Sequence, residues 1–298
     1  MTTEEYRKKL YEEIEENLWQ YRGDKWRAYY KGKCSEMLSF MEEQNKKAGI
    51  FENSCNKGKH QHFWEVLVGN TLLEKGYHPQ RDKRDGAPDY FFEKDGIKIH
   101  VEAKAPTGGT IDELKPKGIP MVNAETIDDE HPFLCGRLDG KNCILRFTST
   151  MSAAVNQIET SFLHHGTVTS HDKMVIAING SDVIGNMEID VNSFGSCTSY
   201  GFNMYCSLFG LDGNEYFLLN ENRCVLSEGL IMKNAEKISN RFFCPENSTP
   251  IDGVIYSNVN MKNYFSEDLP FLFFPNPNKE DISKYFPFCK VIRAPKRE

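Results

Sequence analysis

The sequence predicts an α/β fold with a helical N-terminal arm and a β-rich C-terminal part. Two alternating apolar runs are joined by Asp95-Gly96, a dipeptide typical of a tight hairpin turn. A helical apolar pattern precedes this hairpin, and a second helical pattern and an uninterrupted apolar run follow it. This order is helix, hairpin, helix, strand. With 298 residues, the chain can bury one large core or two modest ones.

The N-terminal part, residues 1–56, is expected to be a helical arm. Leu10, Ile14 and Leu18 recur at four-residue spacing among charged side chains, which is typical of an amphipathic helix. A second helical stretch is expected over about 25–47. Packing or dimerisation is the default role for such an arm.

The core is expected to span 57–180. Its first element is a helix within the stretch 58–79, and the helix ends at Gly76 because glycine is the usual residue just past a helix end. Two strands follow on either side of the Asp-Gly turn, over about 88–93 and 97–104.

The rest of the chain is predicted in less detail. Residues 107–141 are rich in Gly, Pro and Asp and are expected to be a long loop or insertion within the core. A strand over 142–148, a helix over 150–166 and a buried strand over 172–180 complete the core. Short aromatic and β-branched runs over 181–298 predict a β-rich extension or the completion of the central sheet.

Composition and charge restrict the function classes. No apolar run is long enough to cross a bilayer and the N-terminus is a charged helical pattern, so a cytoplasmic protein without a membrane partner is expected. The nine cysteines are scattered singly, which favours reduced thiols. The formal net charge of −7 argues against broad capture of nucleic acid, so a DNA contact must be local. Lys83 and Arg84, in a basic stretch that starts at Lys57, are candidates for it, with an ordinary solvated surface as the alternative.

Three side chains of the hairpin form a candidate catalytic set. Strand side chains alternate between faces, so Glu102 and Lys104 project from the same side. Asp89 begins the partner strand, and the turn is expected to bring its carboxylate close to that of Glu102. Two carboxylates suit Mg²⁺, which stabilises charge on a scissile phosphate and generates hydroxide near neutral pH. Lys104 would orient the attacking water or stabilise the transition state.

This pattern resembles the PD-(D/E)xK superfamily, the restriction-endonuclease-like fold. Pro88-Asp89 is followed, after twelve intervening residues, by Glu102-Ala103-Lys104. The resemblance implies an αβββαβ core with a mixed central sheet, in which the weakly patterned stretch 77–81 would be the first strand. The strings FWEVLVGNTLLEKGYHP and GAPDYFFEKDGIKIHVEAKAP also look like a group of uncharacterised bacterial proteins. Some relatives of that kind have the lysine replaced, so Lys104 makes this copy look catalytically complete.

The resemblance also implies supporting residues and a substrate. Many members carry an additional acidic residue on the helix before the hairpin, for which Glu65 is the matching metal ligand and Glu74 the less favoured one. Gln157 would match a glutamine that some members carry on the following helix. The implied cofactor is Mg²⁺, with Mn²⁺ as a substitute, and the implied substrate is DNA rather than RNA. A restriction or phage-defence endonuclease is expected, with a homodimer as one way to cut both strands.

Other readings of the chain have less support. His60 and His62 lack the further His or Cys cluster that a zinc site needs. His100 shares the face of Glu102 and is a candidate neighbour of the site. No GxxxxGK[ST] phosphate loop occurs, and no cysteine stands out as a nucleophile.

The main alternative class is a noncatalytic nucleic-acid-binding or assembly protein on the same scaffold. A fold alone cannot separate this class from an enzyme. The complete set of two acids and a lysine favours catalysis, whereas the acidic net charge favours the alternative.

Overall fold

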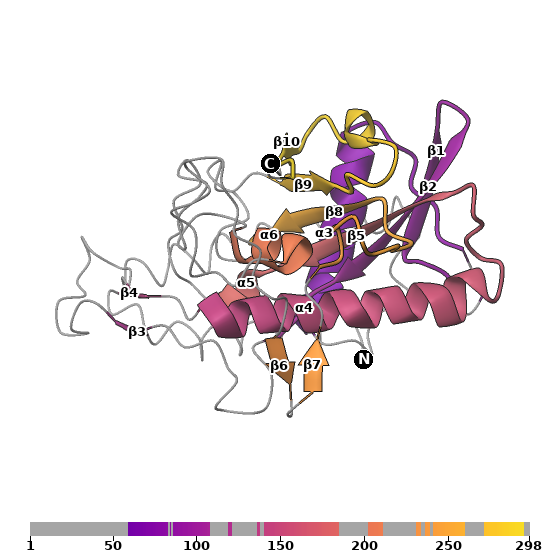
Figure 1. Cartoon of the computed structure of the whole chain (residues 1–298). Helices are drawn as coiled ribbons and strands as arrows, with labels where there is room; N and C mark the ends of the chain where they lie inside the picture. Colours follow the sequence, from indigo (N-terminus) through magenta and orange to yellow (C-terminus); the bar gives the residue numbers. More distant parts are fainter. Residues whose placement is uncertain are drawn as a thin grey trace, which may run out of the picture.

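The computed structural model has an α/β architecture with a mixed six-stranded sheet and helices packed on both of its faces (Figure 1). It describes residues 59–82, 84, 86–107, 119–120, 136–137, 140–184, 202–210, 231–233, 236–238, 241–259 and 271–294. The expected arm over 1–56 and most of the predicted insertion lie outside these residues. Within the described ranges, no helix is long and apolar enough to span a bilayer.

The helix and hairpin predicted for the start of the core are confirmed. Helix α3 is Lys59–Glu74, and strands β1 and β2 are Tyr90–Lys94 and Ile97–Lys104. Both turn residues of Asp95-Gly96 have positive φ, 52° and 74°, which is the conformation that this dipeptide adopts most readily. The weak first strand predicted at 77–81 is reduced to one bridge, between Gln80 and Phe91.

The sheet combines the hairpin with β5, from the middle of the chain, and with three strands from the C-terminal third. Its order is β1-β2-β5-β8-β9-β10. Strand β2 pairs in parallel with β5, and β5 pairs in parallel with β8, whereas β9 is antiparallel to β8 and parallel to β10. These strands are β5 (Lys173–Asn179), β8 (Gly253–Ser257), β9 (Leu272–Pro275) and β10 (Lys290–Val291).

Smaller elements surround this sheet in the described residues. Two short ribbons pair β3 with β4 and β6 with β7. The bounds are β3 (Ile119–Pro120), β4 (Gly136–Arg137), β6 (Ile231–Lys233), β7 (Glu236–Ile238), α5 (Ser181–Ile184), α6 (Phe202–Phe209) and the 3₁₀ helix Ser283–Tyr285. The β3–β4 ribbon falls inside the stretch over 107–141, which the sequence predicts as a long loop or insertion.

The strand predicted over 142–148 is wrong, because this stretch begins helix α4 (Gly140–Gln157). The helix continues as a π-helical turn, Ile158–Leu163. Its first half packs between the sheet and α6, where Cys143, Ile144, Leu145, Phe147 and Thr148 are all buried. Because most of this run is buried, it has no broad polar face to reveal a helical period, and a short apolar run then resembles a strand.

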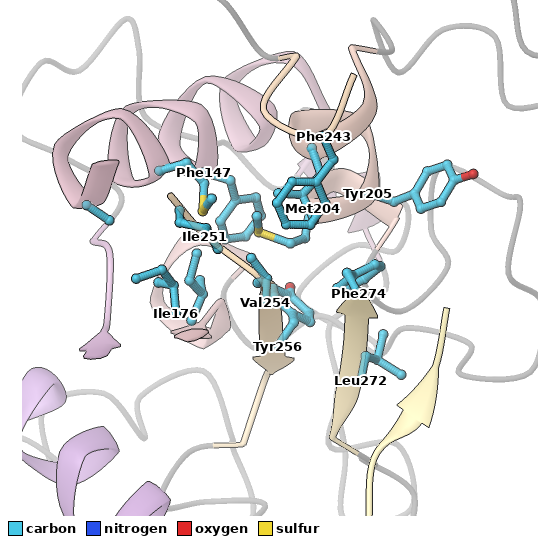
Figure 2. Packing of buried hydrophobic residues seen from close by; sticks show 14 of the residues in the cluster. Phe147, Ile176, Met204, Tyr205, Phe243, Ile251, Val254, Tyr256, Leu272 and Phe274 are labelled. Carbon is cyan, nitrogen blue, oxygen red and sulfur yellow. The ribbon is translucent and has the colours of Figure 1, made fainter. Parts of the chain in front are cut away.

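The core has two parts, one on each face of the sheet. On one face, α4 and α6 pack against β5, β8 and β9 through side chains such as Phe147, Ile176 and Tyr256 (Figure 2). On the other face, α3 packs against Ile99, Val101 and Ala103. Because strand residues alternate between faces, the even-numbered residues of β2 point to the face that α4 covers. Glu102 and Lys104 are therefore on the α4 face.

Trp64 attaches α3 to the sheet. It is fully buried, its Nε1 donates a hydrogen bond to the Ala177 carbonyl at 2.8 Å, and its ring stacks on Phe271 with centroids 6.0 Å apart. Trp64→Phe is expected to lower the free energy of unfolding by about 1–3 kcal/mol, because it removes this hydrogen bond and buried volume. Urea denaturation measures the change. Leu163→Ala, at an exposed position, is the control, and an equal loss in both variants would contradict the role of Trp64.

Candidate active site

The candidate site lies where β1 and β2 separate. Their pairing ends at Tyr90 and Val101, and in the same register Pro88 would be opposite Ala103. Proline has no backbone N–H to donate, so the strand ladder cannot continue normally at this point. The Ala103 N–H instead donates to Asp89 Oδ2 at 2.9 Å. A carboxylate thus takes the place of a strand partner at the open end of the hairpin.

Asp89 and Glu102 interlock through this exchange. The backbone N–H of Asp89 donates to Glu102 Oε2 at 3.1 Å, and both side chains are buried, with exposed fractions of 7% and 5%. Burial, followed by the charge of Asp89, raises the pKa of Glu102 to about 7, although Lys104 acts in the opposite direction. Two buried acids held this close carry negative charge that a bound cation would neutralise.

Lys104 brings a cation to the carboxylates. Its Nζ donates to Glu102 Oε1 at 2.6 Å and to Gln157 Oε1 at 2.7 Å. Gln157 ends α4 directly before the π-helical turn, a helix distortion that is frequent at functional sites. The ammonium is therefore fixed between an acid of β2 and an amide of α4, while a quarter of the side chain stays exposed (25%).

Glu65 lies beside the hairpin and Glu74 does not. Glu65 is buried, its backbone carbonyl accepts from the Tyr90 hydroxyl at 2.9 Å, and its Oε1 accepts from Gln61 Nε2 at 2.8 Å. Glu74 is exposed at the last position of α3, roughly 13 Å further along the helix axis. Of the two acids considered for α3, the structure brings Glu65 toward the site.

His100 shares a strand face with Glu102 but has another partner. It is fully buried, and its Nε2 lies 3.4 Å from Asp172 Oδ2, an electrostatic contact without the geometry of a hydrogen bond. Burial, and then the charge of Lys98, lower the pKa of His100. The ring is therefore a neutral imidazole near pH 7. Among the described residues its closest acid is Asp172, and it makes no hydrogen bond to Asp89 or Glu102.

Of the two basic residues predicted as DNA contacts, neither is seen at the site in the described part of the chain. Lys83 lies outside the described residues, and Arg84 is exposed and ion-paired with Asp82. Arg81 is closer to the site, with its guanidinium 3.8 Å from Asp89 Oδ1. Arg81 belongs to the same basic stretch, between Lys57 and Arg84, as these two residues.

Gln61 is a site residue that the sequence argument missed. Its Nε2 donates to Glu65 Oε1 at 2.8 Å and to the Ala103 carbonyl at 2.7 Å, and its Oε1 accepts from the Ala105 N–H at 2.7 Å. The spacing of Gln61 and Glu65, four residues apart on one helix face, is a signal that could have pointed to it.

The donor set fits a magnesium ion. Among the residues that the structure describes, no group of three or more His, Cys, Asp or Glu forms a metal cluster. Magnesium does not require one, because it binds through one or two carboxylates and keeps several of its waters. Asp89 and Glu102, followed in the chain by the Ala103 carbonyl, supply hard oxygen donors of that kind.

Comparisons of the chain with protein-family models, curated proteins and solved structures found no match. The side-chain geometry at the end of the hairpin is therefore the main indication of function. That geometry joins Asp89, which directly precedes β1, to Glu102 and Lys104 of β2, and it includes one glutamine amide from α3 and one from α4.

Proposed function

We propose that this protein is a Mg²⁺-dependent endonuclease that hydrolyses DNA phosphodiester bonds, with Asp89, Glu102 and Lys104 as its catalytic set. The observation that carries the proposal is the contact of Lys104 Nζ with Glu102 Oε1 at 2.6 Å, on a glutamate that interlocks with Asp89. Phosphodiester hydrolysis needs metal ligands and a positive group near the developing charge, and these three residues supply both. Mn²⁺ is expected to replace Mg²⁺.

Each residue has a separate role in this proposal. Asp89 and Glu102 would hold the ion, and Glu65 is an additional acid for the ion or its waters. A bound Mg²⁺ supplies charge neutralisation at the phosphate and lowers the pKa of water. Lys104, held in place by Gln157, orients the attacking water and stabilises the negative charge of the transition state.

The order of elements supports a PD-(D/E)xK core. Helix α3, the β1–β2 hairpin, α4 and β5 follow one another in the order of the αβββαβ arrangement without its first strand, and the short β3–β4 ribbon lies between the hairpin and α4. The first strand of that arrangement would correspond to the single bridge between Gln80 and Phe91. Residues 57–180 are then the nuclease core, and β8, β9 and β10 complete its sheet.

The proposal extends to the biological setting. The resemblance favours DNA over RNA and supports a role in restriction or phage defence, which we propose takes place in the cytoplasm. A homodimer would give two sites for the two strands, with the N-terminal arm, residues 1–56, as the proposed contact. Double-strand breaks in duplex DNA would support the dimer, whereas single-strand nicks would argue against it.

The proposed activity predicts that Asp89→Asn abolishes cleavage. Wild-type protein is expected to cut plasmid DNA with Mg²⁺ or Mn²⁺ and to stop in EDTA, whereas Asp89→Asn is expected to lose at least about 100-fold in rate, since it loses a charged metal ligand. Asp95→Asn makes the same chemical change at the opposite end of the hairpin, in an exposed turn that asparagine also favours. Equal cleavage by both variants would overturn the assignment of Asp89.

A noncatalytic nucleic-acid-binding or assembly protein is the second candidate. It is favoured by the net charge of −7, and by the finding that the acids of the described residues do not form a larger metal cluster. This candidate predicts salt-sensitive gel shifts without cleavage of DNA or RNA in any divalent metal, and little effect of Asp89→Asn on affinity. Such a result would replace the nuclease proposal.

A further inference from the structure

Gln61 takes the place of a strand partner for the end of β2. A primary amide carries a donor and an acceptor side by side, as the edge of a β-strand does. Nε2 donates to the Ala103 carbonyl and Oε1 accepts from the Ala105 N–H, both at 2.7 Å. Gln61 therefore extends the hydrogen bonding of β2 beyond the point where β1 leaves it, after the Tyr90–Val101 pair.

The two residues held by Gln61 are the neighbours of Lys104. Because the Ala103 carbonyl and the Ala105 N–H are both fixed, the backbone on either side of Lys104 has a defined course. The side chain leaves this backbone toward Glu102 and Gln157. Gln61 thus holds the outer edge of the backbone at Lys104, where β5 pairs with the inner edge through Ile178, and this backbone sets the starting point of the lysine side chain.

The same amide also orients Glu65. Both hydrogens of Gln61 Nε2 are used, one on Glu65 Oε1 and one on the Ala103 carbonyl. The amide orientation is therefore unambiguous, since a flipped amide would face the Ala105 N–H with its own N–H. A glutamate at this position could not donate to either acceptor and would place a further negative charge beside Glu65.

We infer that Gln61 is a positioning residue of the proposed site, which sets Lys104 and Glu65 relative to each other by bridging α3 to the end of β2. This inference rests on the proposed nuclease function. The bridge spans 42 residues of sequence and ends on both sides of the candidate catalytic lysine. It acts on the chemical step through Lys104, not through contact with DNA.

The test compares Gln61→Ala and Gln61→Glu with Gln80→Glu, which makes the same change at an exposed glutamine before the hairpin. In Gln61→Ala, hydrogen exchange at the Ala105 amide is expected to be faster by about tenfold or more, because its acceptor is gone. The amides of Ile99 and Val101 lie in the part of β2 that β1 covers and should be unchanged. Both Gln61 variants are expected to lose about tenfold or more in kcat, with KM for DNA within about twofold of wild type. Gln80→Glu should match wild type throughout.

The outcomes separate the inference from the function on which it rests. Calorimetry with Mn²⁺ is run beside the kinetics, and a wild type that binds no Mn²⁺ and cuts no DNA overturns both. A wild type that cuts, with Gln61 variants of equal kcat, overturns the inference alone, whether or not Ala105 exchanges faster. A rise in KM with unchanged kcat also overturns it, since that marks a DNA contact. If Gln61→Ala does not fold, Gln61→Glu, which keeps the side-chain shape, decides by its kcat.

Discussion

Lys104→Met is expected to lower kcat for DNA cleavage by at least about 100-fold, the size of effect seen when a group that stabilises transition-state charge is removed. Methionine keeps the length of the side chain and removes its charge. Because Lys104 Nζ lies 2.6 Å from Glu102 Oε1, the positive charge is lost at the carboxylates themselves. Plasmid cleavage under metal and DNA saturation measures the change.

Metal binding should survive this substitution. Asp89 and Glu102 remain, and the repulsion between the lysine cation and a divalent ion is removed. Lys104 also lowers the pKa of Glu102, so its loss raises that pKa further and moves metal binding to higher pH. Calorimetry with Mn²⁺ above about pH 8 is therefore expected to give an affinity equal to wild type or tighter.

Lys98→Met is the matched control, because Lys98 lies on the same strand and lies over the Phe91 ring, with Nζ 4.3 Å from the centroid. Its kcat is expected to stay within about twofold of wild type. Cleavage by Lys104→Met within about tenfold of wild type would contradict a catalytic cation at this position. Loss of both Mn²⁺ binding and cleavage would instead show that Lys104 supports the fold of the site.

The parts of the site that could be predicted from sequence are those encoded locally. The turn at Asp95-Gly96 fixes the register of the hairpin, and strand alternation then places Glu102 and Lys104 on one face. Asp89 follows from the same register, opposite Glu102. A short window of sequence holds all of this information.

The contacts that escaped prediction join distant parts of the chain. Gln61 reaches Ala103 across 42 residues, and no rule of local propensity pairs a helix glutamine with a strand backbone. The sequence does show that Pro88 lacks a backbone donor and must interrupt the strand ladder. It does not show that the Asp89 carboxylate replaces the missing strand partner. The order of strands beyond β2 was likewise unreadable, because β5 and β8 join the sheet through parallel pairing across long connections.

The strand predicted for 142–148 failed for a related reason. Helix α4 is covered by the sheet on one side and by α6 on another, so most residues of the run 143–148 are buried. Only the whole fold reveals which faces of a segment are covered. The later part of the same helix, near Gln157, has an exposed side and was predicted correctly.

Glu102→Gln is expected to abolish cleavage. In the metal-free protein, the wild type is expected to lose stability as the pH rises, and Glu102→Gln is expected not to. The pKa of Glu102 is raised from 4.5 to about 7 in the folded protein, first by burial and then by Asp89. Between these values the folded state keeps a proton that the unfolded state has released, so the free energy of unfolding falls as pH rises. The fall is at most about 3 kcal/mol between about pH 5 and pH 8.

Urea denaturation across this pH range, in the presence of EDTA, measures the effect. As the pH rises, the unfolding free energy of Glu102→Gln is expected to increase relative to that of wild type by up to about 3 kcal/mol. Glu93→Gln, at an exposed position of β1, is the control and should run parallel to wild type. Parallel curves for Glu102→Gln as well would mean that Glu102 ionises normally in the folded protein.

Millimolar Mg²⁺ should reverse this order above about pH 7, because a ligand that binds only the folded state stabilises it in proportion to the logarithm of its concentration. Wild-type protein binds the ion through ionised Asp89 and Glu102, whereas Glu102→Gln has lost one of the two charges. The buried pair is thus expected to be a source of instability without metal and of stability with it. Mg²⁺ that leaves the wild-type denaturation midpoint unchanged at pH 8 would argue against a metal site between these acids.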